Sequence, residues 1–215
     1  MKKAAVILNA AIVCLVVYAW ERMFFGMDEG ALLSSARLQS LKYFTVDSNI
    51  LAAAASLCIL PFEVREAFGR PGRSGRPVRG GIPVWALVLK LAATTAVSLT
   101  FVTVMVFLGP MYGYPAMFYG ATLYMHLIVP LLAIFTLCVT ERNKVLTLRH
   151  TLTAVVPMLL YGTAYLVNIL IHGVENNDWY NFAQWGIPAS FLVFLIVASV
   201  TWLLALLLRI GSRKK

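Results

Sequence analysis

The hydrophobic pattern of the chain consists of long apolar runs separated by shorter polar connections. Each run holds about 20 residues, which is the length that an α-helix needs to cross the hydrocarbon core of a bilayer. We count six such runs, at residues 4–25, 41–61, 84–108, 118–140, 152–172 and 187–209. The pattern predicts an all-α, polytopic membrane protein, in which residues 1–215 form a single transmembrane domain built as a six-helix bundle.

The composition supports this prediction. Hydrophobic residues make up 60% of the chain and charged residues only 13%, whereas a soluble globular domain carries about 25% charged residues. A chain so poor in charge cannot cover the surface of a soluble domain of this size. The composition therefore excludes an ordinary soluble enzyme.

The charges are distributed unevenly among the connections. The net charge is +9, and the basic residues gather at the N-terminus, in the Arg-rich link 62–83, after the fourth run and at the C-terminus. Because Lys and Arg are enriched in cytoplasmic loops, this asymmetry predicts that both termini face the cytoplasm. We expect the link 62–83 to be flexible and to meet anionic lipid. Membrane topology accounts for the charge, and no nucleic-acid partner is needed.

The first run also fits a second interpretation. Met1-Lys2-Lys3 and the apolar stretch that follows are typical of a secretory signal peptide, with a cleavage site near Val17-Tyr18-Ala19. Cleavage there would leave five spans in the same orientation. We favour a retained helix, because the apolar character continues through Phe25.

A small polar patch opens the second run. Thr45, Ser48 and Asn49 stand at positions i, i+3 and i+4, which share one face of an α-helix. Polar groups in the hydrocarbon region cost free energy unless they are paired. We therefore expect this patch to face protein or a cavity.

Further polar residues are expected at a similar depth. His126 precedes Pro130 by four positions, and the missing proline N–H predicts a bend and a free carbonyl at the histidine. Asn168 and His172 lie at the outer end of the fifth run. The inner half holds few polar side chains, and we expect Lys90 to reach the cytoplasmic surface. This one-sided polarity predicts a pocket near the outer leaflet rather than a through-channel.

These residue types fit acyl transfer or ester hydrolysis. The Thr45 hydroxyl would be the nucleophile and His126 the general base that accepts its proton, because a threonine hydroxyl is a poor nucleophile without a base. Other polar residues would support the reaction or hold an acidic substrate head group. The candidates are Ser48 and Asn49 as oxyanion donors, Asn168 and His172 as support, and Lys42 and Arg37 for the head group.

Three other interpretations stay open at this point. A threonine in a membrane helix most often bonds a carbonyl of its own helix, and the histidine could serve structure alone. The same pocket could bind a lipid or small molecule without turnover. His126 and His172 could also ligate a haem, although we expect no cofactor. No metal site is expected either, because Cys14, Cys58 and Cys138 fall inside the runs at spacings that fit no metal motif.

Two short motifs resemble one known family. Tyr43-Phe44-Thr45-Val46-Asp47-Ser48-Asn49 and Tyr124-Met125-His126-Leu127-Ile128-Val129-Pro130 are similar to the bacterial branch of the androgen-induced protein family, which includes the androgen-dependent TFPI-regulating protein. Its eukaryotic members are multi-span membrane hydrolases that use a threonine and a histidine to cleave fatty acid esters of hydroxy fatty acids. Asp178-Trp179-Tyr180 resembles the family's aromatic outer loop.

The resemblance implies a role for both motif residues. It implies that Thr45 and His126 are catalytic and that the substrate is a membrane lipid or another amphiphilic ester. It also implies an integral protein of a bacterial inner membrane.

Overall fold

The computed structural model describes residues 1–28, 37–69, 81–175, 177–183 and 185–213. Within these ranges every regular element is a helix. Six helical segments are long and apolar enough to cross a membrane: Lys2–Phe24, Phe44–Phe68, Val84–Tyr112, Ala121–Thr140, Leu148–His172 and Ile187–Gly211. The all-helical class and the six membrane-length helices are thus confirmed. The orientation of the termini stays a prediction.

Several of the six segments are divided into shorter elements. In chain order the elements are α1 (Lys2–Phe24), η1 (Arg37–Lys42), α2 (Phe44–Phe68), α3 (Val84–Thr103), η2 (Val104–Leu108), α4 (Gly109–Tyr112), α5 (Tyr114–Met117), α6 (Ala121–Leu123), η3 (Tyr124–Ile128), α7 (Val129–Phe135), η4 (Thr136–Thr140), α8 (Leu148–Thr153), α9 (Val156–His172) and α10 (Ile187–Gly211). Here η1 is a 3₁₀-helix, and η2, η3 and η4 are π-helical turns.

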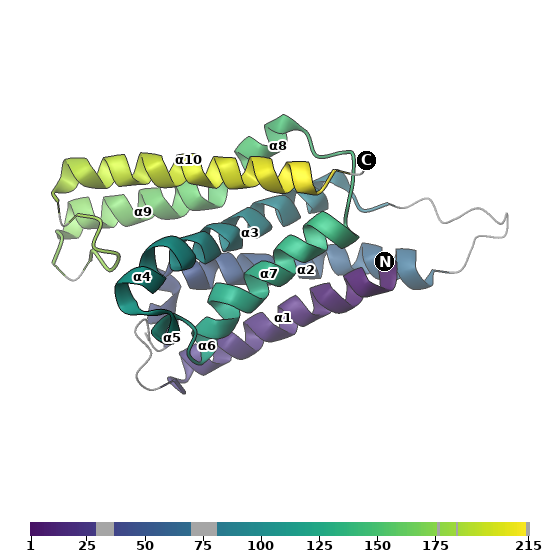
Figure 1. Ribbon diagram of the computed structural model, residues 1–215, viewed down its shortest axis with the longest axis horizontal. Coiled ribbons are helices and arrows are strands. Elements are labelled where there is room, and N and C mark those ends of the chain that lie inside the picture. The colour runs from purple at the N-terminus through teal and green to yellow at the C-terminus, as the bar shows by residue number, and fades with distance from the viewer. Residues whose placement is uncertain (29–36, 70–80, 176, 184, 214–215) are drawn as a thin grey trace.

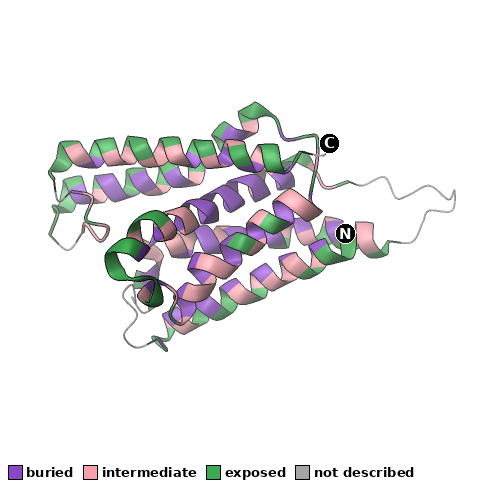
Figure 2. Ribbon diagram, viewed as in Figure 1, coloured by how far each residue is buried: buried purple, intermediate pink, exposed green. Residues whose placement is uncertain are grey.

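The bundle is organised around α3 (Figure 1). The segment Val84–Tyr112 begins with α3, and 61% of the residues in its apolar stretch are buried. In the apolar stretch of α10 only 17% of the residues are buried. Figure 2 shows the same contrast between the two helices. A helix that is apolar on all sides and leaves most of its surface uncovered is suited to face lipid. We therefore take α3 as the central helix and α10 as a peripheral one.

Prolines explain two of the π-helical turns. Pro110 and Pro130 each stand two residues after such a turn, η2 and η3 respectively. A proline removes one hydrogen bond from the helix ladder, and a local change to wider turns accommodates the loss. His126 lies in the π-helical turn η3, and the bend and the free carbonyl expected at this residue stay predictions. Pro61 has a milder effect, because α2 continues past it to Phe68.

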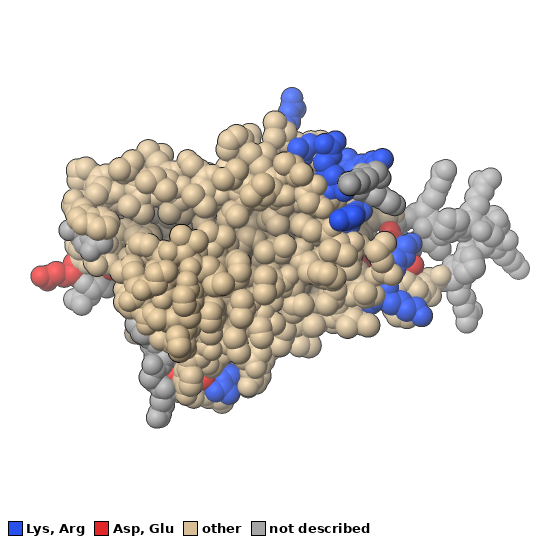
Figure 3. Space-filling model, in the orientation of Figure 1, with Lys and Arg blue, Asp and Glu red and all other residues tan. Residues whose placement is uncertain are grey.

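The two ends of the bundle differ in charge. Lys and Arg gather at the end where both termini lie (Figures 1 and 3). At this end the Asn143 N–H donates to the Ser212 carbonyl at 3.0 Å, which ties α10 to the connection that follows η4. We call it the basic end and, following the predicted topology, we call its opposite the outer end. The predicted flexible link begins inside α2, and its residues 70–80 lie outside the described residues.

An aspartate organises one connection at the outer end. The Asp28 carboxylate accepts the Ala121 N–H at 2.7 Å, at the start of α6, and the Arg22 guanidinium at 3.0 Å. Burial of the carboxyl opposes ionisation, but the hydrogen bonds from Arg22 and Ala121 together hold the pKa of Asp28 below its usual value. Gly120 makes room for this carboxylate, because a Cβ there would lie 2.4 Å from it.

Candidate functional site

The polar patch at the start of α2 is turned inward and bonded to the backbone. The Ser48 hydroxyl and the Asn49 amide both donate to the Thr45 carbonyl, at 3.0 and 2.7 Å. The Asn49 amide nitrogen also donates to the Met125 carbonyl in η3, at 3.1 Å. One buried side chain therefore joins the backbone of the predicted nucleophile to the residue that precedes the predicted base.

His126 is held in one tautomer. Its side chain is fully buried, and Nδ1 lies 2.8 Å from the Met117 carbonyl. A carbonyl can only accept a hydrogen bond, so Nδ1 carries the proton in this contact. In a neutral ring Nε2 is then a bare acceptor, and it is buried without a hydrogen-bond partner among the described residues. An imidazole in this state is prepared to accept a proton.

Thr45 is half-buried, and its hydroxyl has no hydrogen bond to any described residue. Asn49 thus joins the backbones of Thr45 and Met125, and the structure records no hydrogen bond between the Thr45 hydroxyl and the His126 ring. The Asn49 Oδ1 atom is a second buried acceptor without a donor. A buried acceptor that lacks a donor is costly, so the site is suited to a hydroxyl group or water that would donate to it.

The two predicted oxyanion donors are already engaged in this state. The Asn49 amide uses both of its hydrogens on carbonyls. The Ser48 hydroxyl bonds the Thr45 carbonyl and lies 3.1 Å from the Thr100 hydroxyl of α3. Both side chains therefore position the first turn of α2 against η3 and α3.

An aromatic loop covers the start of α2. The Tyr180 hydroxyl accepts the Phe44 N–H at 2.9 Å, and the Trp179 indole donates to the Tyr161 hydroxyl of α9 at 3.1 Å. Burial, reinforced by the neighbouring Tyr161, raises the pKa of Tyr180 well above its usual value, so it stays protonated. The Asp178 carboxylate accepts the Tyr165 hydroxyl and shapes the loop. The loop therefore fixes the residue next to Thr45.

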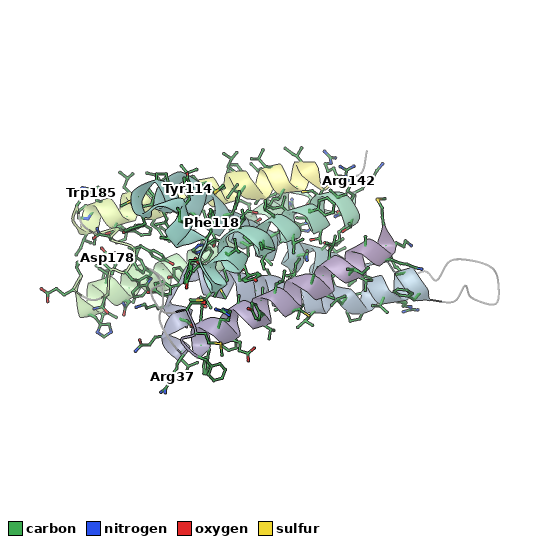
Figure 4. The ribbon with its side chains drawn as sticks, turned by 60° about the horizontal axis from the view of Figure 1, so that its bottom comes forward. Arg37, Tyr114, Phe118, Arg142, Asp178 and Trp185 are labelled. Atoms are coloured by element: carbon green, nitrogen blue, oxygen red, sulfur yellow. The ribbon has the colours of Figure 1, made fainter. Side chains whose placement is uncertain are left out.

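The other predicted site residues lie around this loop or at the outer surface. The Asn168 amide bonds Asn177 at 3.4 Å, and His172 is exposed at the end of α9. The structure records no hydrogen bond between either residue and His126. The Lys42 ammonium lies 5.0 Å from the Tyr43 ring. Arg37 is exposed, and Figure 4 shows it at the same end of the bundle as Asp178, pointing outward.

A second buried polar cluster lies near the basic end, and the sequence reasoning missed it. The Asn9 amide donates to Glu63 at 2.9 Å and to Glu141 at 2.7 Å. The Lys90 ammonium donates to Ser56 at 2.8 Å and to Asn9, and it lies 3.8 Å from Glu141. We call these five residues the inner cluster.

The inner cluster corrects two predictions. The inner half of the bundle is not poor in polar side chains, and Lys90 does not reach the cytoplasmic surface, because only 1% of it is exposed. The spacing of Ser56 and Glu63 could have indicated the inner cluster, because residues seven positions apart lie on one helix face. It was obscured because Pro61 suggested the end of the helix.

Comparison of the chain with protein-family models, curated proteins and solved structures finds no match. The structure alone defines the class, which is an all-helical protein with six membrane-length helices. The family resemblance of the two motifs stays a prediction. Among the described residues no group of three or more His, Cys, Asp or Glu side chains is arranged to hold a metal ion.

Proposed function

We propose that the protein is an intramembrane hydrolase that cleaves a lipid ester in the outer leaflet of a bacterial inner membrane, with both termini in the cytoplasm. Thr45 is the nucleophile and His126 the general base. The substrate class is an amphiphilic ester similar to a fatty acid ester of a hydroxy fatty acid. The observation that carries the proposal is the bare, buried Nε2 atom of His126, on a segment that Asn49 ties to the backbone of Thr45.

The reaction proceeds in two halves. The Thr45 oxygen attacks the ester carbonyl while His126 Nε2 takes the hydroxyl proton, and the resulting imidazolium returns that proton to the leaving alcohol. Water then attacks the acyl-threonine with His126 again as base, which releases the fatty acid and restores the hydroxyl. The reaction requires the Thr45 hydroxyl within hydrogen-bond reach of Nε2, a contact that in many enzymes forms only with substrate bound.

Three features support the assignment of roles. The Met117 carbonyl holds the imidazole by Nδ1, as the orienting group of a catalytic histidine does. Asn49 is a positioning residue, since both its amide hydrogens join the two catalytic segments. The outer loop fixes the Phe44 N–H through Tyr180 and so limits movement of the first turn of α2.

A second candidate function uses the same site without turnover. His126 Nε2 and Asn49 Oδ1 are both buried acceptors without donors, and no hydrogen bond links the Thr45 hydroxyl to the imidazole. A ligand hydroxyl carries one proton and would satisfy one of these acceptors. The site would then bind a hydroxylated lipid or small molecule and leave Thr45 unmodified.

The test combines covalent labelling with turnover. The full chain in lipid nanodiscs is treated with a fluorophosphonate probe and, separately, with a fluorogenic long-chain ester. We expect labelling and hydrolysis in the wild type, loss of both in Thr45→Ala and His126→Gln, and partial retention in Thr45→Ser. Thr163→Ala changes an exposed threonine of α9 and serves as the matched control. Equal labelling of wild type, Thr45→Ala and His126→Gln would refute the hydrolase and leave the binding function.

A further inference from the structure

The inner cluster joins four parts of the bundle at the basic end. Asn9 comes from α1, Ser56 and Glu63 from α2, Lys90 from α3, and Glu141 follows η4 directly. None of these residues is more than 4% exposed. The cluster is therefore a built site in the interior and not a solvated charged surface.

The charges of the inner cluster do not balance. It contains two carboxyl groups, from Glu63 and Glu141, and one ammonium, from Lys90. The Asn9 amide donates to one oxygen of each carboxyl group. The other two oxygens, Glu63 Oε1 and Glu141 Oε2, are buried without any hydrogen-bond partner. An unpaired charge in such surroundings is expensive, so a second positive charge is required.

No other described side chain supplies this second charge. Lys2 lies nearer the surface and pairs with Glu66 at 3.6 Å. Arg142 is exposed and donates to the Cys138 carbonyl at 2.6 Å. From α1 only the neutral Asn9 faces the carboxyl groups, and from α3 only Lys90.

The free oxygens favour a proton over a metal cation. The Lys90 ammonium already uses the oxygens of Asn9 and Ser56, and among the described side chains of the inner cluster two carboxyl oxygens have no hydrogen-bond partner. A sodium or potassium ion needs more oxygen ligands than these two. A proton needs only two oxygens, and the carboxyl groups of Glu63 and Glu141 converge on the same Asn9 nitrogen, at 2.9 and 2.7 Å.

We propose that Glu63 and Glu141 form an intramembrane proton-binding site that together holds one proton. The proton comes from water at the basic end and adds to one carboxylate oxygen, and the new O–H donates to the other carboxylate. The cluster then contains one carboxylic acid, one carboxylate and one ammonium, and its net charge is zero. The ester-hydrolysis site is not needed for this inference.

Infrared difference spectroscopy tests the proposal on the full chain in lipid nanodiscs. A protonated carboxyl group has a carbonyl band that ionised groups lack. We expect such a band in the wild type at neutral pH, disappearing at high pH, with a shift when the glutamates carry ¹³C carboxyl groups. This labelling uses the wild type, so it decides the question even if a variant fails to fold. Absence of a glutamic-acid band from neutral to mildly acidic pH would overturn the proposal.

Variants test the sharing of the proton. Glu63→Gln and Glu141→Gln should each abolish the band at neutral pH, because the remaining carboxylate balances Lys90 alone. Lys90→Gln should double the band, because both carboxyl groups then take up a proton. Glu66→Gln, on the same helix but paired with Lys2, should leave the band unchanged. A band that persists in both cluster variants, or that sodium ions abolish at constant pH, would show that the pair is not a shared proton site.

Discussion

Removal of the Lys90 ammonium is the sharpest test of the inner cluster as a structural element. The side chain is 1% exposed and interacts with three residues from three other parts of the bundle. Lys90→Met keeps most of the volume of the side chain and its unbranched shape but removes the charge and all three donors. The two carboxyl groups then lose the one cationic neighbour that they have among the described residues.

The expected cost follows from the burial of the pair. Breaking a buried ion pair by removal of one partner typically costs about 3–5 kcal/mol, because the remaining group either keeps a charge without a partner or has to take up a proton. We therefore expect Lys90→Met to lower the free energy of unfolding by about that amount. Lys144→Met changes an exposed lysine beyond the end of η4, and it should stay within about 0.5 kcal/mol of the wild type.

A double-mutant cycle separates lost charge from lost packing. Glu141→Gln in the Lys90→Met background removes one of the two carboxyl groups that lack an ammonium and must take up a proton, so the double variant should be more stable than the sum of the single losses predicts. If the cost came from packing alone, the two effects would simply add. Unfolding by SDS in mixed micelles, followed by circular dichroism, provides the free energies. A Lys90→Met variant within about 1 kcal/mol of the wild type would refute the reasoning.

Three further predictions concern the outer end. Asn49→Ala removes one buried and one partly buried hydrogen bond and should cost about 1–3 kcal/mol in the same unfolding assay. Ester turnover should fall with it if the hydrolase proposal is right. Gly120→Ala should destabilise the fold by about 1–3 kcal/mol, because φ is +59° and the new methyl would meet the Asp28 carboxylate. Gly173→Ala, at φ +81° with nothing within 4 Å, measures the backbone part of that cost. Because the folded-state pKa of Asp28 is below its ordinary 3.8, its stabilising effect is present above that pH and is lost as the pH falls further. Unfolding measured against pH should show this loss, and Asp28→Asn should remove it.

The fold class could be predicted because it depends on the length of apolar runs. A stretch of about 20 apolar residues has few alternatives to a membrane-length helix. The ends of the helices were harder to predict. Pro61 does not end α2, since a helix continues past a proline when tertiary packing compensates the lost hydrogen bond. The π-helical turn at His126 was signalled by Pro130, which removes a specific donor.

The candidate site could be predicted only as residue types on a helix face. The spacing of Thr45 and Asn49 placed both on one side of α2. The contact of Asn49 with the Met125 carbonyl joins residues 76 positions apart, and no local pattern encodes it. The tautomer of His126 likewise depends on the Met117 carbonyl, which lies on another element. Such pairings are set by tertiary packing rather than by periodicity.

The two polar sites are joined by one buried face of α2. From Asn49 this face continues through Ala52, Ser56 and Ile59 to Glu63, and all five residues are buried. Between the two sites it packs on an apolar layer from the neighbouring helices. That layer contains Ile12, Val16, Ala93, Val97, Val129 and Ala133.

The side chains of this apolar layer offer no donor or acceptor, but Thr94, Thr95 and Ser98 of α3 are buried between the levels of Lys90 and Thr100. One route by which the inner cluster could influence the outer site is the position of α2 itself. In that case Glu63→Gln would change ester turnover only if it also displaced the first turn of α2 from η3. Amide hydrogen exchange at Ser48 and Asn49, measured in that variant, distinguishes displacement of the helix from a purely local effect.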